Sequence, residues 1–140
     1  MKPSFRIVGV LLLGLLIQTV PSNGQVALIA NKSVSIASID RETLKNIYTL
    51  ESKNIGSLKV VLFDLRDDGV TKSAFYGFMG TTPYELRKSW LRAKLTGTGE
   101  PPTLVSEEDI CNKVANTPGS IGYVSTAKTK DNIQIIMNIE

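Results

Sequence analysis

The short polar segment from Arg66 to Lys72 carries the residues best suited to chemistry. Arg66, Thr71 and Lys72 supply positive charge and hydrogen-bond donors on either side of Gly69. An apolar run precedes this segment, and apolar residues at helical spacing follow it. Free backbone N–H groups at the beginning of such a helix attract anions. The segment therefore predicts an anion site, and a strand-to-helix turn that binds nothing is the alternative.

The composition excludes several kinds of chemistry. The sequence has no histidine and one cysteine, Cys111. Ser–His and Cys–His nucleophile pairs and histidine-based zinc sites are therefore excluded. Cys111 has no partner for an internal disulfide and is expected to be a small core residue. The adjacent acids Asp67 and Asp68 are interpreted as solvated charge in a turn. We expect no enzyme, no metal and no cofactor.

Residues 1–24 have the three-part pattern of a secretory signal peptide. Lys2 and Arg6 precede a nearly continuous apolar run over residues 7–20, and small residues end the segment at Gly24. The apolar run is about 14 residues long, whereas a spanning helix needs about 20. We expect cleavage after Gly24 and a periplasmic or secreted domain of residues 25–140. An uncleaved membrane anchor is the alternative.

Charge gives no indication of a nucleic-acid partner. Without Lys2 and Arg6, 14 basic residues face 13 acidic ones, so the net charge falls to +1. The remaining charges alternate in sign and form no basic block.

The pattern of the remaining chain predicts an α/β fold, a small sheet with helices packed on it. The central strand is expected over Leu58–Phe63, buried on both faces. The other expected strands lie at residues 26–30, 121–124 and 132–137, and helices are expected after Asp40, after Gly69, from Pro83 and after Ser106. Ser33 and Ser35 follow the first strand in a polar loop that either contacts a ligand or only connects elements.

The expected helix from Pro83 has the clearest local signals. Thr82 is its predicted cap, Pro83 occupies the first helical position, and Glu85 completes a capping box. Trp90 is expected to be largely buried on its apolar stripe, with Leu91 and Leu95 beside it.

An ordered set of segments resembles the phosphate-type periplasmic solute-binding proteins of the type 2 periplasmic-binding-protein superfamily. The segments are Asn31 after the first strand, 40–44 leading to Ile47-Tyr48, the central strand into Phe75-Tyr76, 83–86 leading to Trp90, Thr96-Gly97-x-Gly99-x-Pro101-Pro102, and 118–124. Full-length members have two lobes that close on the anion. This chain resembles one lobe, chiefly the second.

The resemblance implies an anion loop at residues 66–71. The family sequence there is Arg-Ser-Asp-Gly-Ser-Gly-Thr, and Asp67 and Val70 stand here in place of the two serines, without the second glycine. The implied ligand-binding residues are the matching Arg66, Asp68, Gly69 and Thr71, joined by Lys72, Ser33 and Ser35.

Two functions follow from this resemblance. The first is an exported solute-binding protein that binds inorganic phosphate or a similar oxyanion and serves a membrane transporter or sensor. The alternative is a lobe reused as an interaction or sensing module with no small ligand of its own, which the shortened loop favours. Whether two chains pair as a homodimer to rebuild a two-lobed site stays open.

Overall fold

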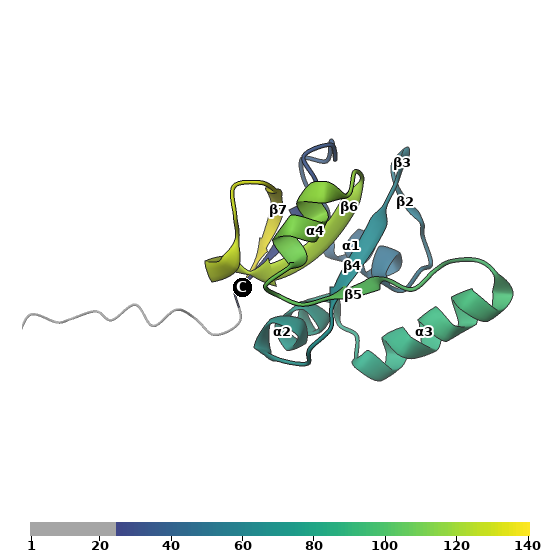
Figure 1. Cartoon of the computed structure of the whole chain (residues 1–140). Helices are drawn as coiled ribbons and strands as arrows, with labels where there is room; N and C mark the ends of the chain where they lie inside the picture. The colour runs from purple at the N-terminus through teal and green to yellow at the C-terminus, as the bar shows by residue number, and fades with distance from the viewer. Residues whose placement is uncertain (1–24) are drawn as a thin grey trace, which may run out of the picture.

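Strand β1 (Val26–Ala30) lies inside a five-stranded mixed sheet of order β5-β4-β6-β1-β7 (Figure 1). The computed structural model describes residues 25–140, so the predicted signal peptide and its cleavage site lie outside the described residues. The other strands of this sheet are β4 (Val61–Leu65), β5 (Thr103–Val105), β6 (Ser120–Ser125) and β7 (Gln134–Ile139). β4 runs parallel to β5 and β6, whereas β1 runs antiparallel to β6 and β7.

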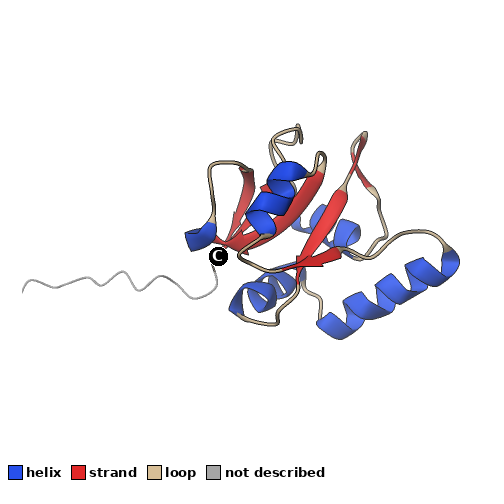
Figure 2. Cartoon of the chain, viewed as in Figure 1, coloured by secondary structure: helices blue, strands red, loops and turns tan. Residues whose placement is uncertain are grey.

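Residues 25–140 form four α-helices, which lie around and beside this sheet (Figure 2). They are α1 (Arg41–Tyr48), α2 (Val70–Met79), α3 (Pro83–Thr96) and α4 (Ile110–Asn116); a hairpin of β2 (Asn54–Ile55) and β3 (Leu58–Lys59) and the short 3-10 helix η1 (Thr126–Lys128) complete the structure. The α/β class predicted from the sequence is therefore confirmed. Within residues 25–140, no helix combines the length and the apolar composition that crossing a membrane requires.

Neighbouring residues of β6 show which helices cover each face of the sheet. Gly122 faces α4, because a Cβ atom there would come within 3.2 Å of Ile110 and Val114. Tyr123 points to the other face and stacks on Phe75 of α2, with 3.8 Å between ring centroids. All five residues of β1 are buried between the two layers. β1 is thus the strand buried on both faces, a role that the sequence prediction gave to residues 58–63, and its unbroken apolar sequence is typical of such a strand.

Local signals place the helix ends correctly in three cases. Asp40 caps α1 by accepting a hydrogen bond from the Thr43 N–H at 2.7 Å. Thr82 caps α3 in the same way through the Glu85 N–H at 3.2 Å. Gly97 ends α3 with a left-handed φ of 70°, a conformation that glycine adopts without steric cost.

The central strand differs from its prediction in position and burial. β4 begins at Val61 and extends through Asp64 to Leu65, three residues later than expected at its start. Its first residues are not buried on both faces, because Val61 is 42% exposed and Leu62 is half-buried. The fully buried part includes Asp64, a residue that composition alone assigns to the following turn.

The helix expected after Ser106 also begins later, at Ile110, and Asp109 occupies its N-cap. Glu107 lies before the helix in a turn, where its side chain accepts the N–H of Ser125. Two short strands, β2 and β5, were not predicted, and β3 occupies the first two residues of the expected central strand as a separate element. Strands of two or three residues are too short for a period to be recognised in the sequence.

Candidate functional site

The loop between β4 and α2 presents a helix N-terminus with no side-chain cap. Gly69 occupies the N-cap in an extended conformation, and no side chain accepts a hydrogen bond from the first turn of α2. The first N–H groups of a helix have no partner within the helix, and the helix dipole gives this end a partial positive charge. The predicted helix is therefore present, and its beginning has the general properties of an anion site.

Arg66 stands at the beginning of this loop with an exposed side chain. Its backbone N–H donates to the carbonyl of Val105 at 2.9 Å, which fixes the loop to the edge strand β5. Among the ion pairs of residues 25–140, none includes Arg66. The guanidinium is therefore available for paired hydrogen bonds to an oxyanion.

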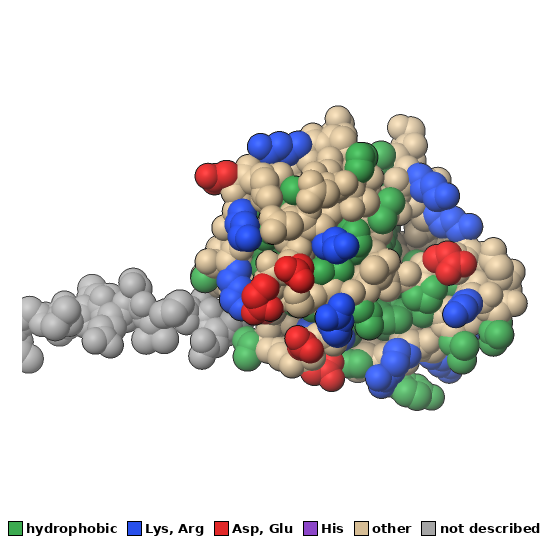
Figure 3. Space-filling model, in the orientation of Figure 1, with side chains coloured by type: hydrophobic (Ala, Val, Ile, Leu, Met, Phe, Trp, Pro, Cys, Tyr) green, Lys and Arg blue, Asp and Glu red, His purple; other side chains and the backbone are tan. Residues whose placement is uncertain are grey.

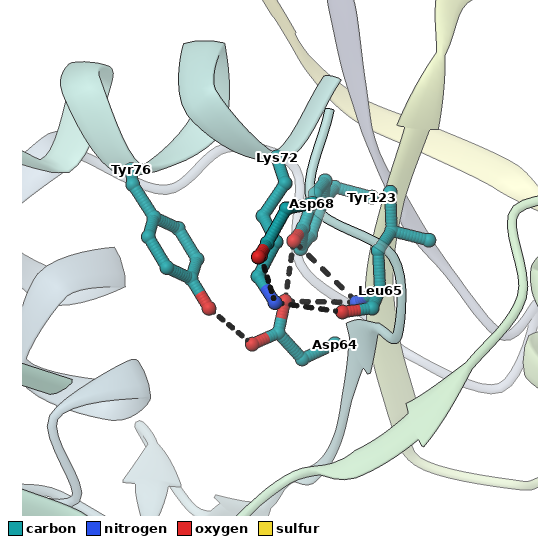
Figure 4. A network of polar contacts seen from close by, with 6 residues as sticks. All are labelled: Asp64, Leu65, Asp68, Lys72, Tyr76 and Tyr123. Carbon is teal, nitrogen blue, oxygen red and sulfur yellow. Dashed lines mark hydrogen bonds and ion pairs between the residues drawn. The ribbon is translucent and has the colours of Figure 1, made fainter. Parts of the chain in front are cut away.

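Lys72 is largely occupied within the protein (Figure 4). Its ammonium group donates to the backbone carbonyl of Leu65 at 3.0 Å and lies 3.4 Å from the carboxylate of Asp68. The same group lies 5.6 Å from the ring centre of Tyr76. The Asp68 side chain is 92% exposed, whereas that of Lys72 is 13% exposed. Lys72 thus ties the first turn of α2 to the end of β4.

Thr71 also has a partner, and that partner is acidic. Its hydroxyl donates to Glu107 Oε1 at 3.0 Å. The same oxygen accepts the N–H of Ser125 at 3.0 Å, and Lys128 lies 3.8 Å from Oε2. A hollow of about 130 Å³ beside Thr71 is lined by the loop and by Glu107 and Glu108, and four of its lining residues are acidic: Asp67, Asp68, Glu107 and Glu108. These carboxylates oppose the attraction that the helix end and Arg66 exert on an anion.

A second hollow lies on the other side of the α2 N-terminus. Its volume is about 270 Å³, and its lining includes Gly69, Lys72 and Tyr76 together with the beginning of α3 at Thr82 and Pro83. Asp68 is the only acidic residue among the lining residues here. This hollow is therefore the less acidic of the two, and Arg66 lines neither of them.

Ser33 and Ser35 lie at the opposite end of the sheet from the loop. β1 ends beside Ile121, at the beginning of β6, whereas β4 runs parallel to β6 and ends at Leu65. Ser33 accepts a hydrogen bond from the Gly119 N–H at 3.0 Å, and both serines line a separate hollow with the β2–β3 hairpin. The structure does not bring the two serines to the predicted site, because β1 is antiparallel to β4.

The sequence interpretation missed a buried polar cluster under the loop (Figure 4). Asp64 is fully buried and accepts hydrogen bonds from the hydroxyl groups of Tyr76, at 2.5 Å, and of Tyr123. Its Oδ1 also accepts the N–H of Leu65 at 2.8 Å. The sequence does contain a signal for this cluster, because Asp64 is followed by an apolar residue at the end of a strand. The tyrosine partners of Asp64, however, come from elements distant in the sequence.

The same cluster changes the acidity of its tyrosines. Burial, and then the hydrogen bond to the Asp64 carboxylate, raises the pKa of Tyr76 far above its usual range. Burial and the charge of Asp64 raise the pKa of Tyr123 in the same direction. Both hydroxyl groups therefore stay protonated as donors and hold the carboxylate in place.

Comparison with known proteins gives a structural likeness without a sequence match. No protein-family model matches the sequence, and no curated protein sequence matches it. The fold is similar to a protein named as a phosphate ABC transporter substrate-binding protein from Clostridium perfringens, solved with bound phosphate, with a TM-score of 0.65 and 21% identity over 79% of this chain. It is also similar to an ABC-type phosphate transport receptor from Vibrio cholerae, with a TM-score of 0.61 and 16% identity over 80% of this chain.

A third solved protein, named as a phosphate-binding protein from Planctomyces limnophilus, gives a TM-score of 0.57 at 15% identity over 81% of this chain. The matches cover 43%, 45% and 42% of the three solved chains, so this chain spans less than half of each. The chain therefore has the α/β fold of one lobe of these binding proteins, as the sequence resemblance predicts.

Proposed function

We propose that this chain is an exported solute-binding protein that holds phosphate or a similar oxyanion at the beginning of α2. The observation that carries this proposal is the uncapped N-terminus of α2, in a loop that also carries Arg66, whose side chain is exposed and in no ion pair among residues 25–140. The fold likeness to proteins named for phosphate binding supports it. A membrane transporter or sensor is the proposed partner, in line with the transport proteins that share the fold.

The proposed mode of binding uses few side chains. The anion accepts hydrogen bonds from the N–H groups of the first turn of α2 and from Arg66. In this mode, the exposed carboxylate of Asp68 accepts a hydrogen bond from the protonated oxygen of hydrogen phosphate. Lys72 contributes positive charge from its place beside Leu65, and Thr71 contributes a donor only by leaving Glu107. Ser33 and Ser35 take no part, because they lie at the other end of the sheet.

A second function, an interaction or sensing module without its own small ligand, is favoured by a different observation. Thr71 and Lys72 already have partners, and four carboxylates line the hollow beside the loop. In this alternative, Arg66 and the surrounding acids contact a partner protein instead of an anion.

Calorimetry with phosphate and with sulfate on the purified protein tests the proposal. We expect the wild type to bind phosphate. Arg66→Ala should lower the affinity by about ten- to a hundredfold, because it removes a charge-assisted hydrogen bond. Arg41→Ala is the matched control, because this exposed arginine lies at the other end of α2, near Gly80. Glu107→Gln keeps the acceptor for Thr71 but removes a negative charge, so it should strengthen binding of either anion.

Absence of binding of both anions at millimolar concentration, in the wild type and in Glu107→Gln, would contradict the anion proposal and favour the interaction module. Equal weakening by Arg66→Ala and Arg41→Ala would show nonspecific attraction to positive charge. The proposed export is tested separately, by N-terminal sequencing of protein recovered outside the cytoplasm, which should begin near Gln25.

A further inference from the structure

The outer face of α3 exposes large apolar side chains. Tyr84 is 70% exposed, Leu91 59% and Leu95 78%. These residues and Lys88 follow a spacing of four, three and four positions, which places them on one side of the helix. We call these four residues the outer face of α3. It occupies the side opposite to the residues that fix the helix to the protein.

The inner side of α3 is well attached, so the exposure is not a sign of a loose helix. Leu86 is fully buried, and Ala93 is 5% exposed. Between them, the indole N–H of Trp90 donates to the carbonyl of Tyr48 at 2.6 Å. The helix therefore has two apolar sides, of which one packs on the domain. Figure 1 shows α3 at the edge of the molecule, with no other element beyond it.

Positive charge surrounds the outer face. Arg87, Lys88, Arg92 and Lys94 are all exposed, whereas Glu85 is the single acidic residue of the helix. The two ion pairs of residues 25–140 lie elsewhere, at Lys72 and Lys128. Figure 3 shows basic and apolar side chains side by side at the lower right, where α3 lies in Figure 1. The helix is thus basic and apolar on the same exposed surface.

The charge and the size of this surface select its occupant. In a twofold pair of chains the same patch would face itself, so the four cations would be brought together. A protein partner needs about 800 Å² on each side, but the outer face is a line of four residues about 16 Å long. Exposed apolar side chains flanked by Lys and Arg are typical of helices that lie in a membrane interface. Anionic headgroups supply the complementary charge.

We propose that the outer face of α3 binds the surface of a membrane rich in anionic lipid, with the helix axis parallel to the membrane plane. Leu91, Leu95 and the ring of Tyr84 enter the headgroup region, and the four cations contact lipid phosphates. The loop at the beginning of α2 is not used, so this inference is independent of the proposed anion site.

Sedimentation with lipid vesicles tests the proposal. The probes are phosphatidylcholine vesicles with about one third phosphatidylglycerol, and pure phosphatidylcholine vesicles. We expect the protein to bind the anionic vesicles, with affinity that falls as salt rises, and not to bind the neutral ones. Leu91→Gln with Leu95→Gln should lower the partition coefficient by at least about tenfold. Replacing Arg87 and Arg92 by Gln should lower it as well.

A matched control changes two equally apolar, exposed residues elsewhere. Leu104 in β5 and Ile135 in β7 are each 45% exposed. The double change Leu104→Gln with Ile135→Gln should leave vesicle binding unchanged. The wild type and all variants are prepared in the same form, either all with residues 1–24 or all without them. Their circular dichroism spectra are compared with that of the wild type. Two results of the sedimentation would overturn the proposal: no binding to anionic vesicles, or equal binding by the α3 and control variants. A column of immobilised polyglutamate is the third test. Retention on this column without binding to vesicles would overturn the proposal and indicate an acidic protein partner.

Discussion

Asp64 is the residue on which the arrangement of the candidate site depends most directly. It is fully buried, and its oxygens accept from two tyrosine hydroxyl groups and one backbone N–H. Tyr76 comes from α2 and Tyr123 from β6, so one carboxylate joins three elements. The loop with Arg66 begins two residues later. A buried carboxylate is stable only with such partners, and here each oxygen has at least one.

Asp64→Ala should lower the free energy of unfolding by about 2–5 kcal/mol, because it leaves two buried hydroxyl groups without their acceptor. Asp64→Asn keeps the shape and one acceptor oxygen and should cost less. Asp67→Ala, at an exposed position three residues along the chain, should change stability by no more than about 0.5 kcal/mol. Urea unfolding measures all three, and equal stability of Asp64→Ala and Asp67→Ala would contradict the role given to Asp64.

Residue roles at the site could be predicted from the sequence only where the signal is local. The turn with Gly69 and the helix that follows it were predicted, because strand, turn and helix are adjacent in the chain. The partner of Thr71 is 36 residues away, and Tyr123 is 59 residues from Asp64. No local pattern encodes such pairs. Ser33 and Ser35 were misplaced for a related reason, since the direction of β1 relative to β4 is a property of the whole sheet.

At the scale of elements, α3 shows both the strength and the limit of sequence patterns. Its cap, its first-turn proline and its final glycine were predicted from adjacent residues. Its orientation was not, because apolar residues occur on two sides of the helix. Trp90 was expected to be largely buried and Leu91 and Leu95 to lie beside it, yet Trp90 is only half-buried and both leucines are exposed.

Trp90→Ala should therefore cost about 2–3 kcal/mol, less than the roughly 3–5 kcal/mol of a fully buried tryptophan. Trp90→Phe should cost about 1 kcal/mol, because it mainly removes the hydrogen bond to the Tyr48 carbonyl. Leu91→Ala, at the neighbouring exposed position, should have a much smaller effect. Thermal unfolding of the three variants tests the order. A larger loss in Leu91→Ala than in Trp90→Ala would mean that the helix is rotated from its described orientation.

For the whole molecule, an aromatic cluster connects both helices of one layer to the sheet. The ring centroids of Tyr48 in α1 and Phe75 in α2 are 5.0 Å apart. Phe75 in turn stacks on the ring of Tyr123 in β6. The hydroxyl of Tyr48 donates to the carbonyl of Phe63 in β4 at 2.8 Å. Cys111 belongs to the other layer, is buried as predicted, and burial raises the pKa of its thiol. The fold class followed from the order of elements, whereas this cluster required the tertiary structure.

The aromatic cluster predicts a loss of stability at alkaline pH. Burial, followed by the charge of Asp64, raises the pKa of Tyr48 and of Tyr123 above the usual value of about 10. Above that pH, the unfolded chain releases phenolic protons that the folded chain still holds. Stability is therefore complete below about pH 10 and falls as pH rises further, by about 1.4 kcal/mol per pH unit for each such tyrosine.

Urea unfolding of the wild type and of Tyr48→Phe between pH 8 and about pH 11 measures this effect. Tyr48→Phe keeps the buried ring but has no phenolic proton, and its lysines titrate as in the wild type. The variant should be less stable at pH 8, where it lacks the hydrogen bond to the Phe63 carbonyl, and should lose less stability above pH 10. Parallel stability curves for the two proteins would contradict the raised pKa of Tyr48. The loss would then have to come from groups that both proteins share, such as Tyr76, Tyr123 and the lysines.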